Sequence, residues 1–171
     1  MRLAEQASAR GIRVDAVYTP NAALVARHEL GSDIESALRR AGASRVYSSE
    51  QIDAPYASSS RTPDAMVVAP CSLRTLAAVA CGLADNLLTR AALNTLRMRR
   101  PLILVVRETP IGVADARNML AAAEAGAVIL PASPAFYHRP RTVMDMVDYI
   151  VGKILDVLGV EHNLYERWGP I

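Results

Sequence analysis

The sequence predicts a three-layer α/β domain built on a doubly wound parallel sheet. Apolar runs at residues 66–69, 101–106 and 128–130 show no polar alternation, which is typical of parallel strands buried on both faces. Segments with helical spacing separate these runs, for example at residues 73–80 and 115–125. Strands that alternate with helices in this way form a parallel sheet with helices on both faces.

The composition fits one globular domain that covers residues 1–171. With 171 residues, 51% of them hydrophobic and 21% charged, the chain can bury one substantial core. A net charge of +2 gives no reason to expect a nucleic-acid partner. No apolar run is long enough for a membrane span, and the charged start lacks the apolar region of a signal peptide. Cys71 and Cys81 cannot form a disulfide framework, so we expect a reducing, cytoplasmic location.

The chain is expected to open with a helix rather than with a strand. The other elements expected from spacing are helices at 2–10, 21–29, 33–40, 86–97 and 142–158, strands at 12–18 and 45–47, and a long surface connection at 48–63. A doubly wound domain normally begins with a strand that leads into its first helix. We therefore expect one strand of the fold to be missing from the start of this sequence.

The turn after the run at 66–69 has the features of an anion site. Pro70 ends the apolar run, and Ser72 stands directly before the helical pattern. A serine at this position can cap the helix while neighbouring amide N–H groups stay free. With Thr75, it places two hydroxyls and the positive end of a helix dipole at the carboxyl edge of the sheet, where open α/β sheets bind ligands. A simple helix cap would give the same pattern.

Arginines and one glutamate form two further candidate groups. Arg90 and Arg97 share one face of a predicted helix, where they either hold a phosphate together or form a solvated basic face. Arg107 and Glu108 directly follow the run at 101–106. They form either an ion pair at the strand end or an anion clamp beside an acid/base group.

The C-terminal third holds three more candidates, each with a plain structural alternative. Tyr137 either contacts a ligand or plugs its proline-rich loop onto the core. Lys153 lies off the apolar stripe of the last helix, so spacing alone predicts a solvated side chain. Trp168 either covers a pocket or docks the chain terminus. The histidines are scattered and neither cysteine has a nearby partner ligand in sequence, so we expect no metal.

Four motifs occur in a fixed order along the chain. They are Ala69-Pro-Cys-Ser-Leu-Arg-Thr-Leu-Ala77, Val106-Arg-Glu-Thr-Pro110, Pro134-Ala-Phe-Tyr-His-Arg-Pro140 and Arg167-Trp168. Together they resemble the UbiX-type flavin prenyltransferases, and the match runs from Met1 to Trp168. The resemblance implies a flavodoxin-like (Rossmann-like) fold. Relative to the family this chain is N-terminally truncated, because it lacks the opening strand and its Gly-Ala-Ser-Gly loop.

The resemblance also implies an activity. Enzymes of this family transfer a dimethylallyl group from dimethylallyl phosphate to N5 and C6 of reduced FMN, without a metal. The product, prenylated FMN, is the cofactor of UbiD-type decarboxylases. Sites shared between subunits imply a homo-oligomer based on a trimer, with a dodecamer as its larger form.

The residue roles that the resemblance implies fall into three groups. The expected FMN contacts are Thr19, Ser72, Leu73, Arg74, Thr75 and Arg107. The residues expected to hold dimethylallyl phosphate are Arg90, which reaches a neighbouring subunit's site, Arg97, which replaces the usual lysine, Tyr137 and Lys153. The expected catalytic residues are Glu29 and Glu108 as acid/base groups and Trp168 as the cover of the prenyl group.

Two other functions stay open at this point. The missing first loop favours a non-catalytic FMN-binding accessory subunit. A flavin-dependent decarboxylase of cysteinyl substrates would share the fold, but those enzymes resemble one another in a Pro-x-Met-Asn loop. This chain has Pro131-Ala-Ser-Pro134 instead.

Overall fold

Strand β4 (Leu102–Val106) lies at the centre of the molecule. In the computed structural model, which describes residues 1–169, all five of its residues are buried. It pairs in parallel with β3 (Met66–Cys71) on one side and β5 (Val128–Pro131) on the other. The uniform burial of β4 explains why its sequence shows no polar alternation.

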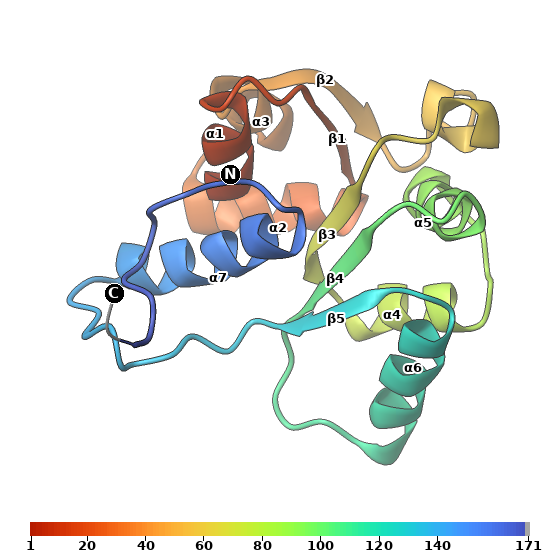
Figure 1. Cartoon of the computed structure of the whole chain (residues 1–171). Coiled ribbons are helices and arrows are strands. Elements are labelled where there is room, and N and C mark those ends of the chain that lie inside the picture. Colours follow the sequence, from red (N-terminus) through yellow and green to blue (C-terminus); the bar gives the residue numbers. More distant parts are fainter. Residues whose placement is uncertain (170–171) are drawn as a thin grey trace.

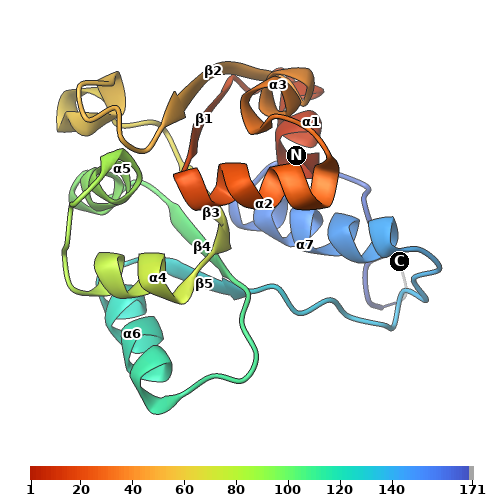
Figure 2. The same cartoon turned by 180° about the vertical axis from the view of Figure 1, so that it is seen from behind.

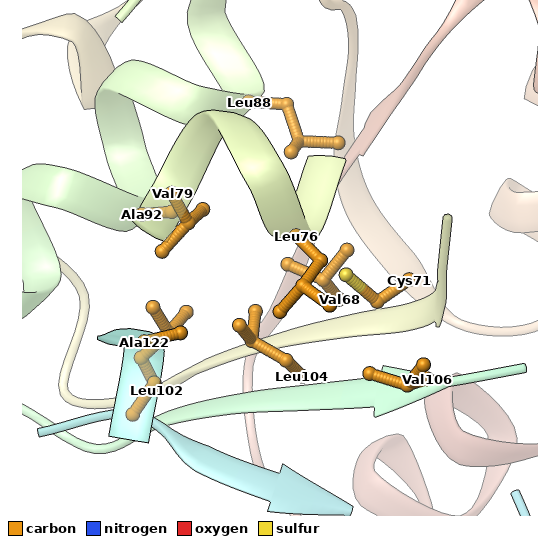
Figure 3. Packing of buried hydrophobic residues seen from close by; sticks show 11 residues of the cluster. Val68, Cys71, Leu76, Val79, Leu88, Ala92, Leu102, Leu104, Val106 and Ala122 are labelled. Atoms are coloured by element: carbon orange, nitrogen blue, oxygen red, sulfur yellow. The ribbon is translucent and has the colours of Figure 1, made fainter. Parts of the chain in front are cut away.

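The two faces of this three-stranded sheet are covered by different helices. Leu102, Leu104 and Val106 pack against helices α4 (Leu73–Ala80), α5 (Leu87–Arg97) and α6 (Val113–Glu124). Figure 3 shows Leu76 of α4 close to Val68 and Cys71 in this cluster. Ile103 and Val105 point to the other face, where they pack against α7 (Val143–Val157). The result is the expected three-layer arrangement (Figure 1).

A second parallel pair lies beside the first sheet. Strand β1 (Val14–Tyr18) pairs with β2 (Ala43–Ser48), and within residues 1–169 no pairing joins β1 to β3. The remaining helices are α1 (Arg2–Ser8), α2 (Pro20–Leu30) and α3 (Ile34–Arg40). An ion pair between Arg2 and Asp148, 2.6 Å from Nε to Oδ1, ties α1 to α7. The predicted α/β class with parallel strands is therefore confirmed, with the strands divided between two sheets.

Two boundaries and one loop differ from the sequence-based expectation. Pro70 does not end its strand, because β3 continues to Cys71 through a register shift. Proline lacks an N–H donor and fits a strand at such an irregularity. Pro131 is likewise the last residue of β5 rather than the residue after it. The connection at 48–63 contains two short 3₁₀ helices, η1 (Pro55–Ala57) and η2 (Ser59–Arg61).

The helices of the described residues 1–169 are too short or too polar to cross a membrane. The longest of them is α7, with 15 residues.

Truncating Leu104 to alanine is expected to destabilise the fold strongly. Its side chain is fully buried in the cluster shown in Figure 3. Large-to-small changes in such positions lose transfer free energy and leave a cavity, so we expect the free energy of unfolding to fall by about 2–5 kcal/mol. Urea unfolding measures this change. Leu120→Ala on α6, where the leucine is 60% exposed, is the matched control and should leave the midpoint almost unchanged.

Candidate functional site

Helix α4 begins with an open set of amide donors. Ser72 is its N-cap, and Ser72 Oγ accepts a hydrogen bond from the Thr75 amide at 3.2 Å. Ser72 Oγ also donates to Thr75 Oγ1 at 3.1 Å, so both hydroxyls are fixed in place. Among residues 1–169, the amide groups of Leu73 and Arg74 find no acceptor. Free amides at the positive end of a helix suit an anionic group of a ligand.

A second helix start lies on the same side of the molecule. Thr19 is the N-cap of α2, and its Oγ1 accepts a hydrogen bond from the Ala22 amide at 3.1 Å. Val17, near the end of β1, packs against the core cluster that contains Leu76 of α4. Figure 2 shows α2 starting close to the carboxyl end of β3. The expected contacts at Thr19 and Ser72 are thus brought to one edge of the fold.

The arginines near this edge differ in how firmly they are held. Arg74 Nη2 lies 2.7 Å from Asp85 Oδ2, so its guanidinium is engaged within the chain and its backbone amide remains for a ligand. Arg107 and Glu108 are exposed after β4, and no ion pair joins them in the described part of the chain. The Glu108 carboxylate accepts a hydrogen bond from the Thr109 amide at 3.1 Å. The strand-end ion pair considered above is therefore not formed.

Tyr137, Lys153 and Trp168 come together at α7. The ring of Tyr137 lies edge-on to Trp168, with 5.3 Å between centroids, and edge-on to Tyr149 at 6.2 Å. Lys153 Nζ lies 5.5 Å from the centroid of the Tyr149 ring and 4.9 Å from that of Tyr165. The neighbouring Tyr165 hydroxyl raises the pKa of Lys153, which favours the charged ammonium. Spacing alone had predicted a merely solvated lysine.

A cleft adjoins this aromatic cluster. Its volume is about 360 Å³, and it is lined by Tyr137, Arg139, Glu166, Arg167, Trp168 and Gly169. A larger open hollow of about 810 Å³ lies between η1, η2 and the start of β1, and no predicted site residue lines it. The cleft at Tyr137 and Trp168 therefore coincides with two of the sequence-based candidates.

Arg90, Arg97 and Glu29 stand apart from both groups within the single chain. Arg90 and Arg97 are on α5, and Figures 1 and 2 place α5 and α7 on opposite sides of the three-stranded sheet. Arg97 Nη1 donates to Asn94 Oδ1 at 3.1 Å, and Arg90 is exposed. Glu29 is exposed near the end of α2. One chain alone does not gather these side chains with Tyr137 and Lys153.

Comparisons with known proteins identify the family of this chain. The family model described as Flavoprotein matches residues 1–159. The flavin prenyltransferase UbiX of Saccharolobus solfataricus is 43% identical over 160 residues, which cover 92% of this chain and 79% of that protein. The chain belongs to the UbiX-type flavin prenyltransferase family. The resemblance found in the four motifs is thereby confirmed.

Two solved structures of UbiX proteins are also close to this chain. A crystal structure of AnUbiX in complex with FMN and dimethylallyl pyrophosphate has a TM-score of 0.93 and 35% identity, and the match covers 99% of this chain and 89% of that chain. A dodecameric FMN-dependent UbiX-like decarboxylase from Escherichia coli O157:H7 has a TM-score of 0.90 and 34% identity, covering 98% and 90% of the two chains. The flavodoxin-like α/β fold expected from the motifs is confirmed by these matches.

Sequence reasoning missed a partly buried carboxylate beside the aromatic cluster of this UbiX-type chain. Asp156 on α7 accepts hydrogen bonds from the Tyr165 hydroxyl and from Arg167 Nη2, the latter at 2.7 Å. His162 Nε2 lies 3.0 Å from the same carboxylate. Burial by itself would raise the pKa of Asp156, but these hydrogen bonds outweigh burial and lower the pKa to about 2. The carboxylate is therefore ionised at neutral pH.

No group of three or more histidine, cysteine, aspartate or glutamate side chains in the described residues 1–169 is arranged to hold a metal ion.

The two thiols of this UbiX-type chain are expected to react very differently. Cys71 is fully buried at the end of β3, and burial raises the pKa of its thiol to about 12. Cys81 is exposed after α4. Because the thiolate is the reactive form, a thiol reagent at pH 7.5 should label Cys81 rapidly and Cys71 only after unfolding. Mass spectrometry of the labelled native and urea-unfolded protein measures this, and rapid double labelling of the native protein would contradict it.

Proposed function

We propose that this protein is a flavin prenyltransferase that transfers a dimethylallyl group from dimethylallyl phosphate to N5 and C6 of reduced FMN. The observation that carries the proposal is the match, over nearly the whole chain, to a UbiX protein crystallised with FMN and dimethylallyl pyrophosphate. The names of the curated relatives support the same activity. Nothing observed in the fold or the site favours the accessory subunit or the cysteinyl decarboxylase.

The carboxyl edge of the sheet fits a flavin nucleotide. The free amides of Leu73 and Arg74 and the hydroxyl of Ser72 offer donors to an anionic or carbonyl group of the ligand. Thr19 contributes a second capped helix start on the same side, and Arg107 is exposed directly after β4. Reduced FMN, when bound there, supplies the nucleophilic atoms N5 and C6.

Cationic and phenolic groups would carry the negative charge of the departing phosphate. As the bond between the primary allylic carbon and its phosphate oxygen breaks, charge grows on that oxygen. Lys153 and the Tyr137 hydroxyl come from the α7 side of one chain. Arg90 and Arg97 are on α5 at the opposite side of the sheet, so we propose that they complete the site of a neighbouring copy in a homo-oligomer.

Glu108 and Glu29 would handle the protons. Closing the new ring needs one proton delivered to the prenyl alkene and one removed from flavin C6, which suits two carboxyl groups in opposite protonation states. Glu108 stands exposed after β4 on the loop beside Arg107. Trp168 would cover the prenyl group, because the face of an indole favours an electron-deficient fragment.

The product and its destination complete the proposal. Prenylated FMN would pass to a UbiD-type decarboxylase, and the reaction would take place in the cytoplasm, where reduced thiols such as the two cysteines persist. The 1–171 unit would act as one flavoprotein domain, assembled into a trimer-based oligomer.

Anaerobic incubation with reduced FMN and dimethylallyl phosphate tests the activity. The extracted flavin is then analysed by mass spectrometry, with a sample lacking the phosphate donor as the control. A flavin heavier by one dimethylallyl group, minus the hydrogen it replaces, supports the proposal. Unmodified flavin that co-purifies with the protein would instead support an accessory subunit. Carbon dioxide released from a cysteinyl peptide would support the decarboxylase.

A further inference from the structure

We infer that Asp156 is a positioning residue: it fastens the C-terminal tail, residues 159–169, onto α7, and so holds Lys153 against the aromatic cluster and Trp168 at the cleft that adjoins it. The inference rests on the proposed function only in assigning Lys153 and Trp168 to the prenyl donor. The fastening itself follows from contacts within this chain.

Asp156 receives hydrogen bonds from three residues of the tail. Tyr165 and Arg167 donate through their hydroxyl and guanidinium groups. The third donor is the imidazole of His162, whose side chain is only 1% exposed. Its Nδ1 accepts a hydrogen bond from the Leu164 amide at 3.2 Å, so the proton lies on Nε2 and is directed at Asp156. One carboxylate on α7 thus binds donors spread over six residues of the tail, from His162 to Arg167.

The backbone of α7 is shaped to receive the same tail residues. Gly152 lies one helical turn before Asp156, in the interior of the helix, where glycine is normally unfavourable. A Cβ at this position would lie 2.6 Å from the ring of Tyr165 and 2.7 Å from that of His162. The glycine therefore permits the close approach that puts both rings within reach of Asp156.

The fastened tail contacts one proposed substrate-facing group, Lys153, and carries the other, Trp168. The centroid of the Tyr165 ring lies 4.9 Å from Lys153 Nζ, and Asp156 Oδ2 lies 3.7 Å from the same ammonium. Immediately after Arg167, Trp168 stands against the ring of Tyr137 and is 81% exposed to the cleft and solvent. Among residues 1–169, Tyr137 is the aromatic ring that Trp168 contacts, so the position of Trp168 depends on the residues that precede it. Releasing Asp156 would free the ammonium of Lys153 and the indole of Trp168 at once.

The fluorescence of Trp168 tests the fastening directly, because it is the only tryptophan in the chain. We compare Asp156→Asn with Asp148→Asn in the full-length, flavin-free protein. Asp148 is the matched control: it lies on the same helix and is also bonded to an arginine, but its partner is Arg2 on α1 rather than the tail. Asp156→Asn should lower the steady-state anisotropy of Trp168 and speed tryptic cleavage after Arg167. Asp148→Asn should change neither, and equal behaviour of the two variants would overturn the fastening.

Kinetics then test the consequence for the substrate. With dimethylallyl phosphate and reduced FMN, Asp156→Asn should raise the KM for the phosphate donor about 10-fold, as expected for loss of a charged hydrogen-bonding partner. The dissociation constant for FMN should stay unchanged, because the expected flavin contacts lie at the ends of β1, β3 and β4. A KM equal to that of the wild type, in a variant whose tail is shown to be released, would overturn the positioning role.

Gly152→Ala gives an independent check that leaves every charge in place. The added methyl group should displace Tyr165 and His162 and reproduce the lowered anisotropy of Trp168. An unchanged anisotropy in this variant would contradict the close approach on which the fastening depends. If the wild-type protein transferred no prenyl group, the proposed function would fail, while the anisotropy results would still decide the fastening.

Discussion

Replacing Glu108 by glutamine is expected to remove prenyl transfer while leaving flavin binding intact. The carboxyl group stands exposed on the loop after β4, and within the described residues 1–169 it accepts a hydrogen bond only from the amide of its neighbour Thr109. Glutamine keeps that acceptor and the size of the side chain but cannot donate or take up a proton at neutral pH. Loss of a general acid/base group typically lowers the rate by about 10²–10⁴-fold. Single-turnover formation of prenylated FMN measures the effect.

Glu124→Gln provides the control for this change. Glu124 is an exposed carboxylate at the end of α6, away from the carboxyl edge of the sheet. Its replacement should leave both flavin binding and turnover unchanged. Full turnover in Glu108→Gln would show that Glu108 takes no part in the proton transfers. Loss of bound flavin in this variant would show that Glu108 binds the flavin instead.

Replacing Lys153 by methionine is expected to have the second large effect. Lys153 is the only lysine in the chain, and its ammonium lies over the rings of Tyr149 and Tyr165, in the aromatic cluster that the cleft adjoins. Methionine keeps an unbranched stem but removes the charge that would meet the departing phosphate. We expect kcat/KM for dimethylallyl phosphate to fall by about 10²–10³-fold, the range found when one preorganised donor to a developing anion is removed. Steady-state assays at varied donor concentration give this value.

A control variant and the anisotropy of Trp168 distinguish a specific role of Lys153 from the general effect of losing one positive charge. Arg117→Met removes an exposed cation from α6 and should not change kcat/KM. Trp168 anisotropy should stay high in Lys153→Met, because the tail remains bound to Asp156 through Tyr165, His162 and Arg167. A low anisotropy in this variant would mean that Lys153 itself fastens the tail, contrary to the separation proposed here.

Much of the fold could be predicted from local patterns. The run at 101–106 has no polar alternation because β4 is covered on both faces, and Ser72 caps its helix as its position suggested. The extent of β3 could not be predicted from Pro70, because the register shift that accommodates the proline depends on the neighbouring strand. Nor could spacing show that the strands fall into two sheets, since strand pairing is a long-range property.

The candidate site likewise contains residues that the sequence could predict and residues that it could not. Ser72 and Thr75 could be proposed from one stretch of sequence, because the cap and its helix are adjacent. Asp156 could not, because its partners lie on a tail that folds back across α7, and no periodic pattern records such a contact. One signal was present: Gly152 interrupts an otherwise regular helical pattern, and an isolated glycine there often marks a close approach. Lys153 was proposed from family resemblance rather than from spacing.

The central claim is that this protein joins the loss of phosphate from an isoprenoid to the alkylation of reduced FMN. The most direct test measures inorganic phosphate and prenylated flavin in the same anaerobic reaction. We predict that the two products appear in equal molar amounts and that neither forms when reduced FMN is left out. Phosphate release that proceeds without reduced FMN, or that is not matched by a flavin adduct, would contradict the account.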